Sequence, residues 1–583
     1  MARAGERPRL GPRGRRILLG LGLVAGLWLL VTVVMLFQAR RSIDAGVQRL
    51  EEARELLSPG DLVRGEGREA IRAARRDFER ARDLAGSPLL APLEAVPVLG
   101  QQVRSVDAQT AAAADIVRIG ESAVTDAERE FHVRPATGPE RVALLEEVGR
   151  IAARAEKRLR SVDLGPDFFL VGPVGDARAE FADKLQEVRA SLADSQAAAA
   201  GLTKFLRGPG RYLVLAANNA EMRAGSGMWL SAGVLTVEGG GFELGEMRPT
   251  GDLLVPAGAV PVAGDLAARW GFLDPTHDFR NLAATPRFDA TAPLAADMWA
   301  ALTGETVQGV LVLDPLTLRA LLAAQGPIDA AGRTLDADNV LQYLFLEQYR
   351  EASLADPTQQ ARRDRLGEIA GVAVDAFEDR AWEPADLADE LTPAGRGRHV
   401  LAWSRDPVEQ RGWEAAGVAG GLRPDSLLVS LMNIGGNKLD QFVTIDGVVA
   451  VRHRGGGREV TVRLRIANDA SPDEPSYVIG PFPGTDLAPG EYLGILAVDV
   501  PGAAREAGID GADLAAAGAD GPDRVVATVV RIAAGERRAF TVRFRVPGGT
   551  GGMRVEPSAR EPQIRWRFGS VEWLDEGAKR LEW

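Results

Sequence analysis

An uncharged run near the amino terminus constrains the fold of this chain more than any other feature. Residues 17–37 carry no charged side chain, and a helix of this length, rising about 1.5 Å per residue, crosses a hydrocarbon layer of about 30 Å. A cleaved secretory signal has a shorter apolar region and a small-residue cleavage site, whereas this run ends in MLFQARR. We therefore predict an uncleaved transmembrane helix over residues 17–37.

The distribution of arginine predicts the orientation of this helix. Residues 1–16 hold six arginines and one glutamate, whereas only Arg40 and Arg41 follow the run directly. Because basic segments stay on the cytoplasmic side, residues 1–16 are expected to form a cytoplasmic tail and the bulk of the chain to lie outside. The chain has no cysteine, which suits a bacterial extracytoplasmic protein. The predicted location is the bacterial plasma membrane, crossed once.

Two glycines inside the predicted span leave the oligomeric state open. Gly22 and Gly26 form a G-x-x-x-G pair, and such pairs let two membrane helices approach closely. A homo-oligomer held by this contact is one alternative and a monomer is the other. The surrounding GLGLVAG imitates a dinucleotide fingerprint, but it follows no strand and lies inside the predicted span.

Charge and residue types argue against several functions. The 583 residues carry a net charge of −12, whereas a general nucleic-acid binder needs clustered cations to displace counterions. No nucleic-acid partner is therefore predicted. The four histidines are far apart and no thiolate is present, which disfavours a zinc site. No G-x-S-x-G nucleophile elbow occurs either.

Residues 38–206 show helical spacing of apolar residues. The run Phe181, Leu185, Val188, Leu192, Ala199 and Leu202 follows steps of three, four and seven, which is typical of a bundle or coiled coil. Between the helices, SPLLAPLEAVPVLGQQ (87–102) contains three prolines and a glycine, which interrupt a helix. We predict an extracytoplasmic helical stalk. A partner-binding coiled coil is the alternative.

In the rest of the chain the pattern of apolar and polar residues changes twice. Short apolar runs divided by glycines, together with helical patterns such as 315–326 and 336–352, predict an α/β domain with a mixed sheet over residues 207–436. Alternation with a period of two predicts a β-sandwich over 437–550, followed by a polar tail over 551–583. The predicted fold class is α+β multidomain.

Polar residues gather where the predicted strands of the α/β domain end. They are Asn218, Asn219, Glu221 and Arg223 after one strand, Arg248 and Asp252 after another, and Arg362, Arg363 and Arg365 at the start of a helix. Guanidinium groups suit an anionic phosphate or pyrophosphate because they offer a planar donor fork. The alternative is local: the two asparagines satisfy a turn, Glu221 pairs with Arg223, and the later arginines form a solvated helix face.

A family resemblance covers most of the chain after residue 37. The stretch YLVLAANNAEMRAGSGMWLSAGVLTVEGG resembles the signature of the bacterial DUF4012 family, a domain of unknown function common in actinobacteria. The resemblance extends to PLLAPLEAVPVLGQQ, VQGVLVLDPLTLRALLAAQGPI, LDADNVLQYL, HVLAWSRDPVEQ and NIGGNKLD. It implies an architecture and no chemistry.

The order of elements is also similar to that of the LytR-CpsA-Psr family, which transfers glycopolymers from polyprenyl pyrophosphate lipids to peptidoglycan. That resemblance implies a pyrophosphate-binding role for Arg248 and a metal-holding or basic role for Asp252. It also implies further phosphate ligands at the helix start, namely Arg362, Arg363 and Arg365. In that family the Arg and Asp are adjacent, whereas RPTGD separates them here, and AGSGM lacks the family's acid. The loss of that carboxylate weakens a magnesium site, so the cofactor stays unknown with magnesium as the candidate.

The function expected from these observations is that of a membrane-anchored cell-envelope protein. Its α/β domain would bind or transfer a lipid-linked or wall glycopolymer. In the catalytic version Glu221 or Asp252 takes a proton from the acceptor hydroxyl, while Asn218, Asn219 and the arginines bind the ligand. The alternative is a non-catalytic envelope scaffold that contacts peptidoglycan or protein partners.

Overall fold

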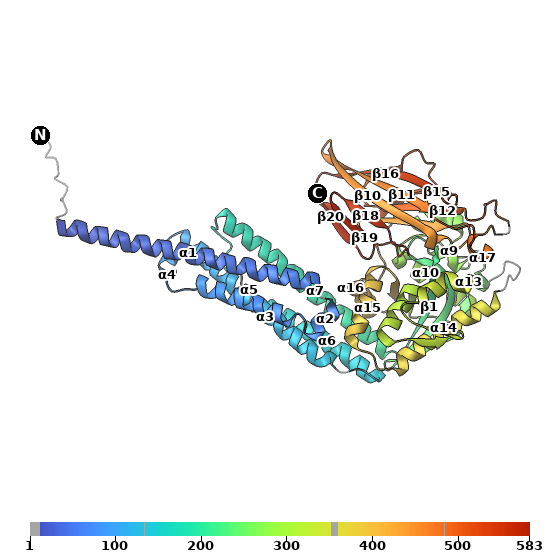
Figure 1. Ribbon diagram of the computed structural model, residues 1–583, viewed down its shortest axis with the longest axis horizontal. Helices are drawn as coiled ribbons and strands as arrows, with labels where there is room; N and C mark the ends of the chain where they lie inside the picture. Colours follow the sequence, from blue (N-terminus) through green and yellow to red (C-terminus); the bar gives the residue numbers. More distant parts are fainter. Residues whose placement is uncertain (1–11, 57, 133, 351–358, 483) are drawn as a thin grey trace. The chain divides into compact units, whose positions relative to one another are not determined.

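The computed structural model describes residues 12–56, 58–132, 134–350, 359–482 and 484–583. Within these helices, the side chains of residues 12–26, 29, 53–56, 59, 62, 63 and 360 are not described. The chain divides into two compact units (Figure 1). Unit 1 comprises residues 1–130 and 150–193, and unit 2 comprises residues 131–149 and 194–583.

Unit 1 is built from helices. They are α1 (Pro12–Leu56), α2 (Pro59–Arg64), α3 (Arg68–Ala85), α4 (Ala91–Glu94) and α5 (Leu99–Phe131), with parts of α6 (Gly138–Leu159) and α7 (Gly172–Arg207). Ile43, Val47 and Leu50 recur on one side of α1 and pack on Phe78 of α3. A Cβ at Gly46 would lie 2.8 Å from the Phe78 ring, so the glycine lets α1 and α3 approach closely.

The predicted membrane span lies within α1. Its residues 17–26 and 29 have side chains outside the described part of the structure. Among the residues that are described, no helix is both long enough and apolar enough to cross a bilayer. The structure therefore does not support the predicted transmembrane helix.

Unit 2 begins with a mixed sheet in the order β3-β2-β1-β5-β8, with β4 paired to β2. Its strands are β1 (Gly210–Met222), β2 (Gly227–Glu238), β3 (Gly241–Leu244), β4 (Arg248–Pro249), β5 (Gly309–Leu313) and β8 (Val400–Ser404). β1 runs parallel to β5 and antiparallel to β2. The carboxyl ends of β1 and β5 therefore meet at one edge of the sheet.

Helices cover both faces of this sheet. Along β1, Leu213 and Leu215 pack against α9 (Phe279–Leu282) and α10 (Phe288–Thr303). Tyr212 and Val214 alternate with them and pack against Phe205 of α7 and Trp413 of α16 (Pro407–Ala416). Both faces of β1 are thus buried, which explains its nearly continuous apolar sequence.

The remaining elements of this part of unit 2 are short strands and helices. They are η1 (Thr250–Asp252), α8 (Gly264–Trp270), η2 (Gly271–Leu273), α11 (Pro315–Gln325), β6 (Ile328–Ala330), β7 (Arg333–Leu335), α12 (Val340–Gln342), η3 (Tyr343–Glu347), α13 (Gln348–Arg350), α14 (Gln360–Asp379) and α15 (Pro384–Arg396). The segment predicted as one helix over 336–352 contains a π-helical turn, η3, between α12 and α13.

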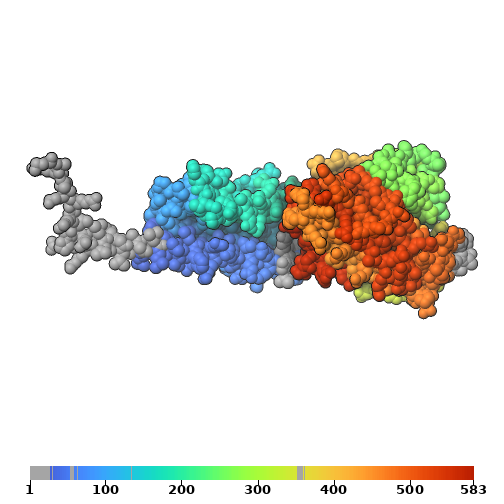
Figure 2. Space-filling model, turned by 90° about the horizontal axis from the view of Figure 1, so that it is seen from above, coloured from blue at the N-terminus to red at the C-terminus, as the bar shows by residue number. Residues whose placement is uncertain are grey.

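Two further sheets share one core. The first has the order β13-β16-β11-β10-β18-β19, and the second has the order β14-β15-β12-β9-β17-β20. Val460, Val462 and Leu464 of β11 are buried in the same cluster as Leu427 and Val429 of β9. In the space-filling view these strands, orange to red, form much of the visible face of unit 2 (Figure 2).

The bounds of these elements are as follows. They are β9 (Ser426–Asn433), η4 (Asp440–Phe442), β10 (Val443–Arg454), β11 (Gly457–Asn468), α17 (Ser476–Ile479), β12 (Tyr492–Val500), β13 (Arg505–Ile509), β14 (Ala516–Asp520), β15 (Asp523–Ile532), β16 (Arg537–Pro547), β17 (Gly552–Val555), β18 (Arg565–Phe568), β19 (Val571–Leu574) and β20 (Lys579–Glu582). The predicted class, a mixed α+β chain of several domains, is confirmed at this level.

The paired sheets extend beyond the predicted 437–550. β9 lies before that range, and residues 551–583, predicted as a polar tail, instead supply β17 to β20. β17 runs parallel to β9, and β18 runs parallel to β10. Each of these late strands is only four residues long, so none shows the alternation on which the prediction relied.

Three buried aspartates, Asp499, Asp520 and Asp523, lie in these sheets. Asp499 of β12 and Asp523 of β15 have no hydrogen-bond partner on either carboxylate oxygen among the described residues. Burial, together with the nearby carboxylates of Glu556 and Asp520, raises the pKa of Asp523 to about 8. Burial also raises the pKa of Asp499 well above its ordinary value. The folded chain therefore holds protons that the unfolded chain releases.

We expect Asp523→Asn to stabilise the protein increasingly as pH rises from about 4 to about 8. Over this range the unfolded carboxyl ionises while the folded one stays protonated, so the wild type loses stability with rising pH. The amide cannot ionise, and its advantage should reach about 1–3 kcal/mol at pH 8. Chemical denaturation of both proteins at several pH values measures this difference. Asp513→Asn, at an exposed position in the loop between β13 and β14, is the control, and an equal pH dependence in both variants contradicts the assignment.

Candidate functional site

The two asparagines at the end of β1 are buried and make specific contacts. The Asn219 amide nitrogen donates to the Asp314 carboxylate at 2.8 Å and to the Ala559 carbonyl at 2.7 Å. The Asn218 amide nitrogen donates to the Tyr349 hydroxyl at 2.6 Å, and its carbonyl oxygen accepts from the Ala220 amide. These side chains join strand ends to distant segments of unit 2.

Asp314 shows why the parallel strands place polar groups together. It follows β5 directly and caps α11 by accepting from the backbone amides of Leu316 and Thr317. Its second oxygen accepts from Asn219 and lies 2.6 Å from the His399 ring nitrogen Nδ1. Burial alone would lower the pKa of His399, but the adjacent carboxylate raises it above its ordinary value.

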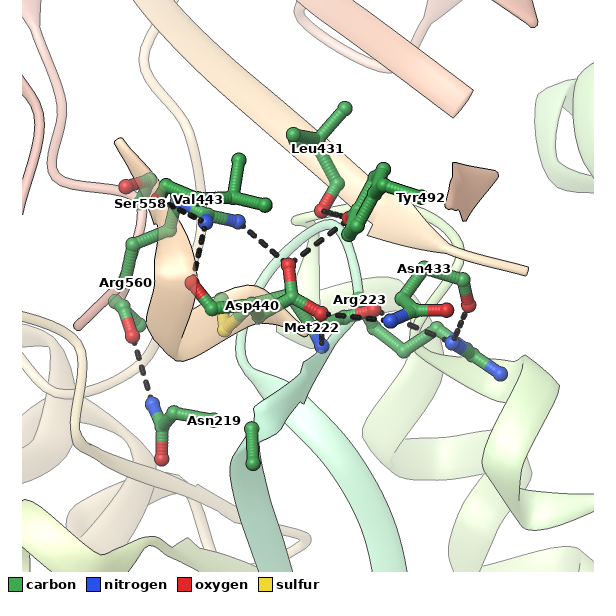
Figure 3. A network of polar contacts seen from close by, with 12 residues as sticks. Asn219, Met222, Arg223, Leu431, Asn433, Asp440, Val443, Tyr492, Ser558 and Arg560 are labelled. Atoms are coloured by element: carbon green, nitrogen blue, oxygen red, sulfur yellow. Dashed lines mark hydrogen bonds and ion pairs between the residues drawn. The ribbon is translucent and has the colours of Figure 1, made fainter. Parts of the chain in front are cut away.

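Asp440 is the centre of a buried polar network (Figure 3). One carboxylate oxygen accepts from Tyr492 at 2.9 Å and from Arg560 at 2.9 Å. The other accepts from the Met222 amide at 3.0 Å and from Asn433 at 3.0 Å. Four donors therefore satisfy the carboxylate, as a buried charge requires. The network ties the end of β1 to both later sheets.

Glu221 and Arg223 do not pair with each other. The Glu221 carboxylate accepts from the Lys438 ammonium at 2.8 Å, and both side chains are buried. The Arg223 guanidinium donates to the carbonyls of Arg280, at 2.8 Å, and of Met222 and Asn433. Burial lowers the pKa of Arg223, and the carboxylates of Glu221 and Asp440 oppose this shift. The local alternative for this pair is therefore not what the structure shows.

A cleft of about 480 Å³ opens beside this network, within unit 2. Its described polar and charged lining is Glu221, Arg223, Ser231, Thr250, Asp278, Arg280, Asn281, Arg362, Arg363, Asn433, Lys438 and Tyr477. Apolar lining comes from Met228, Leu230, Pro249, Leu366 and Ile434. A cleft of this size and composition suits a small ligand or one end of a larger one.

The cationic side chains of the cleft differ in how they are neutralised. Lys438 pairs with Glu221, Arg280 with Asp278, and Arg363 with Asp252 at 3.2 Å. Arg223 and Arg362 have no carboxylate at ion-pair distance in the part of the chain that the structure describes. Five cationic side chains thus face two carboxylates in the described lining, although the whole chain is acidic.

Arg362 is held by aromatic rings rather than by charge. Its guanidinium lies 5.3 Å from the Tyr349 ring centre and 5.8 Å from that of Tyr477. One hydrogen bond, at 3.4 Å, links it to the Gln348 side chain. Its Nε is buried without a hydrogen-bond partner among the described residues. The guanidinium is therefore positioned but only partly satisfied.

The structure separates the predicted site residues into groups. Glu221, Arg223, Arg362 and Arg363 line the one cleft. Asn218 and Asn219 make the buried contacts described above and are not part of the described lining of the cleft.

The other predicted residues do not line the cleft. Arg248 lies on β4 with an exposed side chain. Asp252 is exposed and forms an ion pair with the cleft residue Arg363. Arg365 lies on α14, outside the described lining.

Several residues of the site were not predicted. Lys438, Asn433 and Asp440 all belong to NIGGNKLD, a motif that carried the family resemblance without an assigned role. No motif in the sequence pointed to Arg280 or Asp278. Arg560 lay in the predicted tail, where nothing in the sequence indicated a buried cation.

No cluster of three or more metal-ligating side chains occurs among the residues that the structure describes. Asp252, to which the resemblance gave a metal-holding role, forms an ion pair with Arg363.

Comparisons with known proteins identify part of unit 2. Residues 207–349 match the model of DUF4012, described as a protein of unknown function. The predicted resemblance to this family is thereby confirmed over those residues, whereas a relation to the LytR-CpsA-Psr family is not shown. No curated protein and no solved structure matches the chain.

We expect Asp440→Asn to destabilise unit 2 by about 3–5 kcal/mol. The substitution leaves Arg560, which is 2% exposed, buried without a charged partner. Urea denaturation monitored by tryptophan fluorescence measures the loss. Asp446→Asn, which removes the exposed partner of Arg565, should change stability by less than about 1 kcal/mol. Equal effects of the two substitutions would contradict the central role of Asp440.

Proposed function

Starting from the match of residues 207–349 to the DUF4012 family, we propose that the cleft of unit 2 binds the phosphate or pyrophosphate of a lipid-linked or wall glycopolymer. The single observation that carries this proposal is the excess of cationic groups in a cleft of an acidic chain. A bacterial cell-envelope protein with this cleft would act on the polymer outside the cytoplasm.

The environment of the arginines supports an anionic ligand. Arg223 is buried and bound only to carbonyl oxygens, and Arg362 is bound to an amide side chain and two rings. Carbonyl groups satisfy the donors of a guanidinium but do not neutralise its charge. A phosphate in the cleft would supply the negative charge that neutralises the guanidinium groups, and its oxygens would accept hydrogen bonds from their planar donor forks.

The apolar residues of the lining favour a phosphate that is attached to an apolar group. Met228, Leu230 and Leu366 line the cleft beside the charges. A lipid-linked phosphate presents this combination of an anion and an apolar chain. A free sugar, which carries hydroxyls and no charge, would leave the guanidinium groups without an anion.

The proposal is for binding, and it assigns the carboxylates supporting roles. Glu221 lines the cleft but is held by Lys438, so it neutralises that ammonium. Asp252 is exposed and neutralises Arg363. In a transferase of this class, Glu221 and Asp278 would be the carboxylates of the described cleft lining that lie beside the bound ligand.

The proposal includes anchorage to the membrane. The uncharged run of residues 17–37 and the arginines that precede it support a single crossing with residues 1–16 in the cytoplasm. Anchorage would hold the protein on the membrane whose lipids carry polyprenyl phosphates.

We expect Arg362→Gln to weaken binding of geranylgeranyl pyrophosphate about 10- to 100-fold. Loss of a charge-assisted hydrogen bond costs about 1.5–3 kcal/mol. Isothermal titration calorimetry of the full chain in detergent measures the affinity. Inorganic pyrophosphate and geranylgeraniol are tested in parallel, so that the contributions of the phosphate and of the lipid are distinguished.

Arg365→Gln is the matched control. It removes an arginine from the same helix, α14, at a position outside the described lining of the cleft. Binding should persist in this variant. The proposal fails if neither pyrophosphate compound binds the wild type, or if both arginine variants lose affinity equally.

The predicted topology can be tested by thiol labelling because the chain has no cysteine. In intact spheroplasts, a membrane-impermeant maleimide should label Val571→Cys, which is exposed, and should leave Ala4→Cys unlabelled. Lysis should make Ala4→Cys reactive. Labelling of Ala4→Cys before lysis, or protection of Val571→Cys, would overturn the proposed orientation.

A further inference from the structure

We propose that one end of unit 1 inserts apolar side chains into the lipid bilayer, beside the segment 17–37. This apolar end consists of residues 87–99 and 166–171. The inference rests on the proposed membrane anchorage and adds a second contact with the same membrane. It does not depend on the ligand of the cleft.

The apolar end exposes an unusual number of large apolar side chains. They are Leu89, Val96, Val98, Leu99, Phe168, Phe169 and Val171, with exposed fractions from 40% to 78%. Phe169 is the most exposed of them and adopts a left-handed backbone conformation, with φ of 54°. Soluble surfaces carry such residues singly, whereas a gathered group marks a contact with a partner or a membrane.

Hydrogen bonds hold the two segments of the apolar end together. The Gln102 amide nitrogen donates to the Phe169 carbonyl at 2.8 Å, and its side-chain oxygen accepts from the Val171 amide at 2.9 Å. Gln102 lies on α5, three residues after the end of the first segment. One side chain therefore links both loops, and the apolar residues form one surface.

The apolar end lies beside α1. The Trp28 indole nitrogen donates to the Leu89 carbonyl at 2.9 Å, and Figure 1 shows α4 next to the amino-terminal half of α1. Trp28 belongs to the uncharged run. At about 1.5 Å per residue it lies about 14 Å along the helix from Phe37, where the run ends. A membrane that surrounds residues 17–37 would therefore also contain the apolar end.

Exposed apolar side chains are also found on α1 itself. Leu27, Leu30, Val33, Val34 and Phe37 are exposed on this helix. Charges are rare beside them, since Glu94 and Asp167 are the only charged residues of the two loop segments. Basic side chains follow at the border: Arg41 stacks on Phe37 at 4.6 Å, and Arg104 begins the charged part of α5. Arginine at such a border binds lipid headgroups.

The backbone of the first segment suits a lipid environment. Unpaired amide groups are costly in hydrocarbon, and Pro88, Pro92 and Pro97 have no amide hydrogen to satisfy. Most of the other amides donate within the segment, namely those of Leu90, Ala91, Leu93, Ala95, Val96 and Leu99 to backbone carbonyls and that of Leu89 to the Ser87 hydroxyl. In a loop that is exposed to water, these amides could donate to solvent instead. The hydrogen bond from Trp28 to Leu89 places this paired backbone beside the predicted span, which favours lipid over a protein partner.

Single cysteines test this inference in the full chain, because no native thiol interferes. Val171→Cys and Val98→Cys are labelled with the fluorophore NBD and reconstituted into phosphatidylcholine–phosphatidylglycerol vesicles. We expect a blue shift of NBD emission and at least a two-fold loss of intensity with doxyl-labelled acyl chains. Val188→Cys is the matched control: it has nearly the same exposure as Val171, 43% against 47%, but lies about 25 Å further along α7.

A third label, Leu30→Cys, separates this inference from the proposed anchorage. Quenching at Leu30, Val98 and Val171, but not at Val188, supports both. Quenching at Leu30 alone leaves the anchorage standing and overturns the insertion of the apolar end. A blue shift at Val98 that grows with protein concentration and is insensitive to doxyl lipid assigns the surface to a second copy of the chain and overturns the inference. Failure of the protein to float with the vesicles overturns both.

Discussion

The site of unit 2 depends on one buried carboxylate. Asp440 accepts four hydrogen bonds, from the Met222 amide, Asn433, Tyr492 and Arg560. These donors come from the end of β1, from β9, from β12 and from the segment before β18. A buried charge is tolerated only when such partners surround it. The position of each segment is therefore fixed by the need to satisfy this group, and the lining of the cleft follows from that arrangement.

The electrostatics of the cleft follow from the same arrangement. Asn433 supplies a side-chain amide to Asp440 and a backbone carbonyl to Arg223. Lys438, two residues before Asp440, reaches Glu221 on β1. The motif NIGGNKLD thus provides partners for Glu221 and Arg223 at the end of β1, while Arg362 reaches the cleft from α14. This leaves cationic groups bound to neutral partners, which is the basis for expecting an anion.

Local sequence patterns predicted much of the architecture. The period-two spacing of Val460, Val462 and Leu464 indicated a strand with one buried face, and the structure buries all three. Helical spacing indicated the helices that pack around Phe78 and Leu185. The strands β17 to β20 were not predicted because four residues do not establish a period. β17 and β18 pair with the distant strands β9 and β10, and β20 and β19 pair with β17 and β18 in turn.

The sequence by itself determined which residues carry charge, where the polar motif after β1 begins and where the uncharged run lies. It also placed Arg362 and Arg363 on one helix and Arg223 after one strand. Only the tertiary structure decided the partners. Glu221 binds Lys438 rather than Arg223, and Arg248 and Arg365 lie outside the described lining of the cleft. The reason is physical: an ion pair forms across space between groups that burial leaves without water, and spacing along the chain does not specify which groups those are.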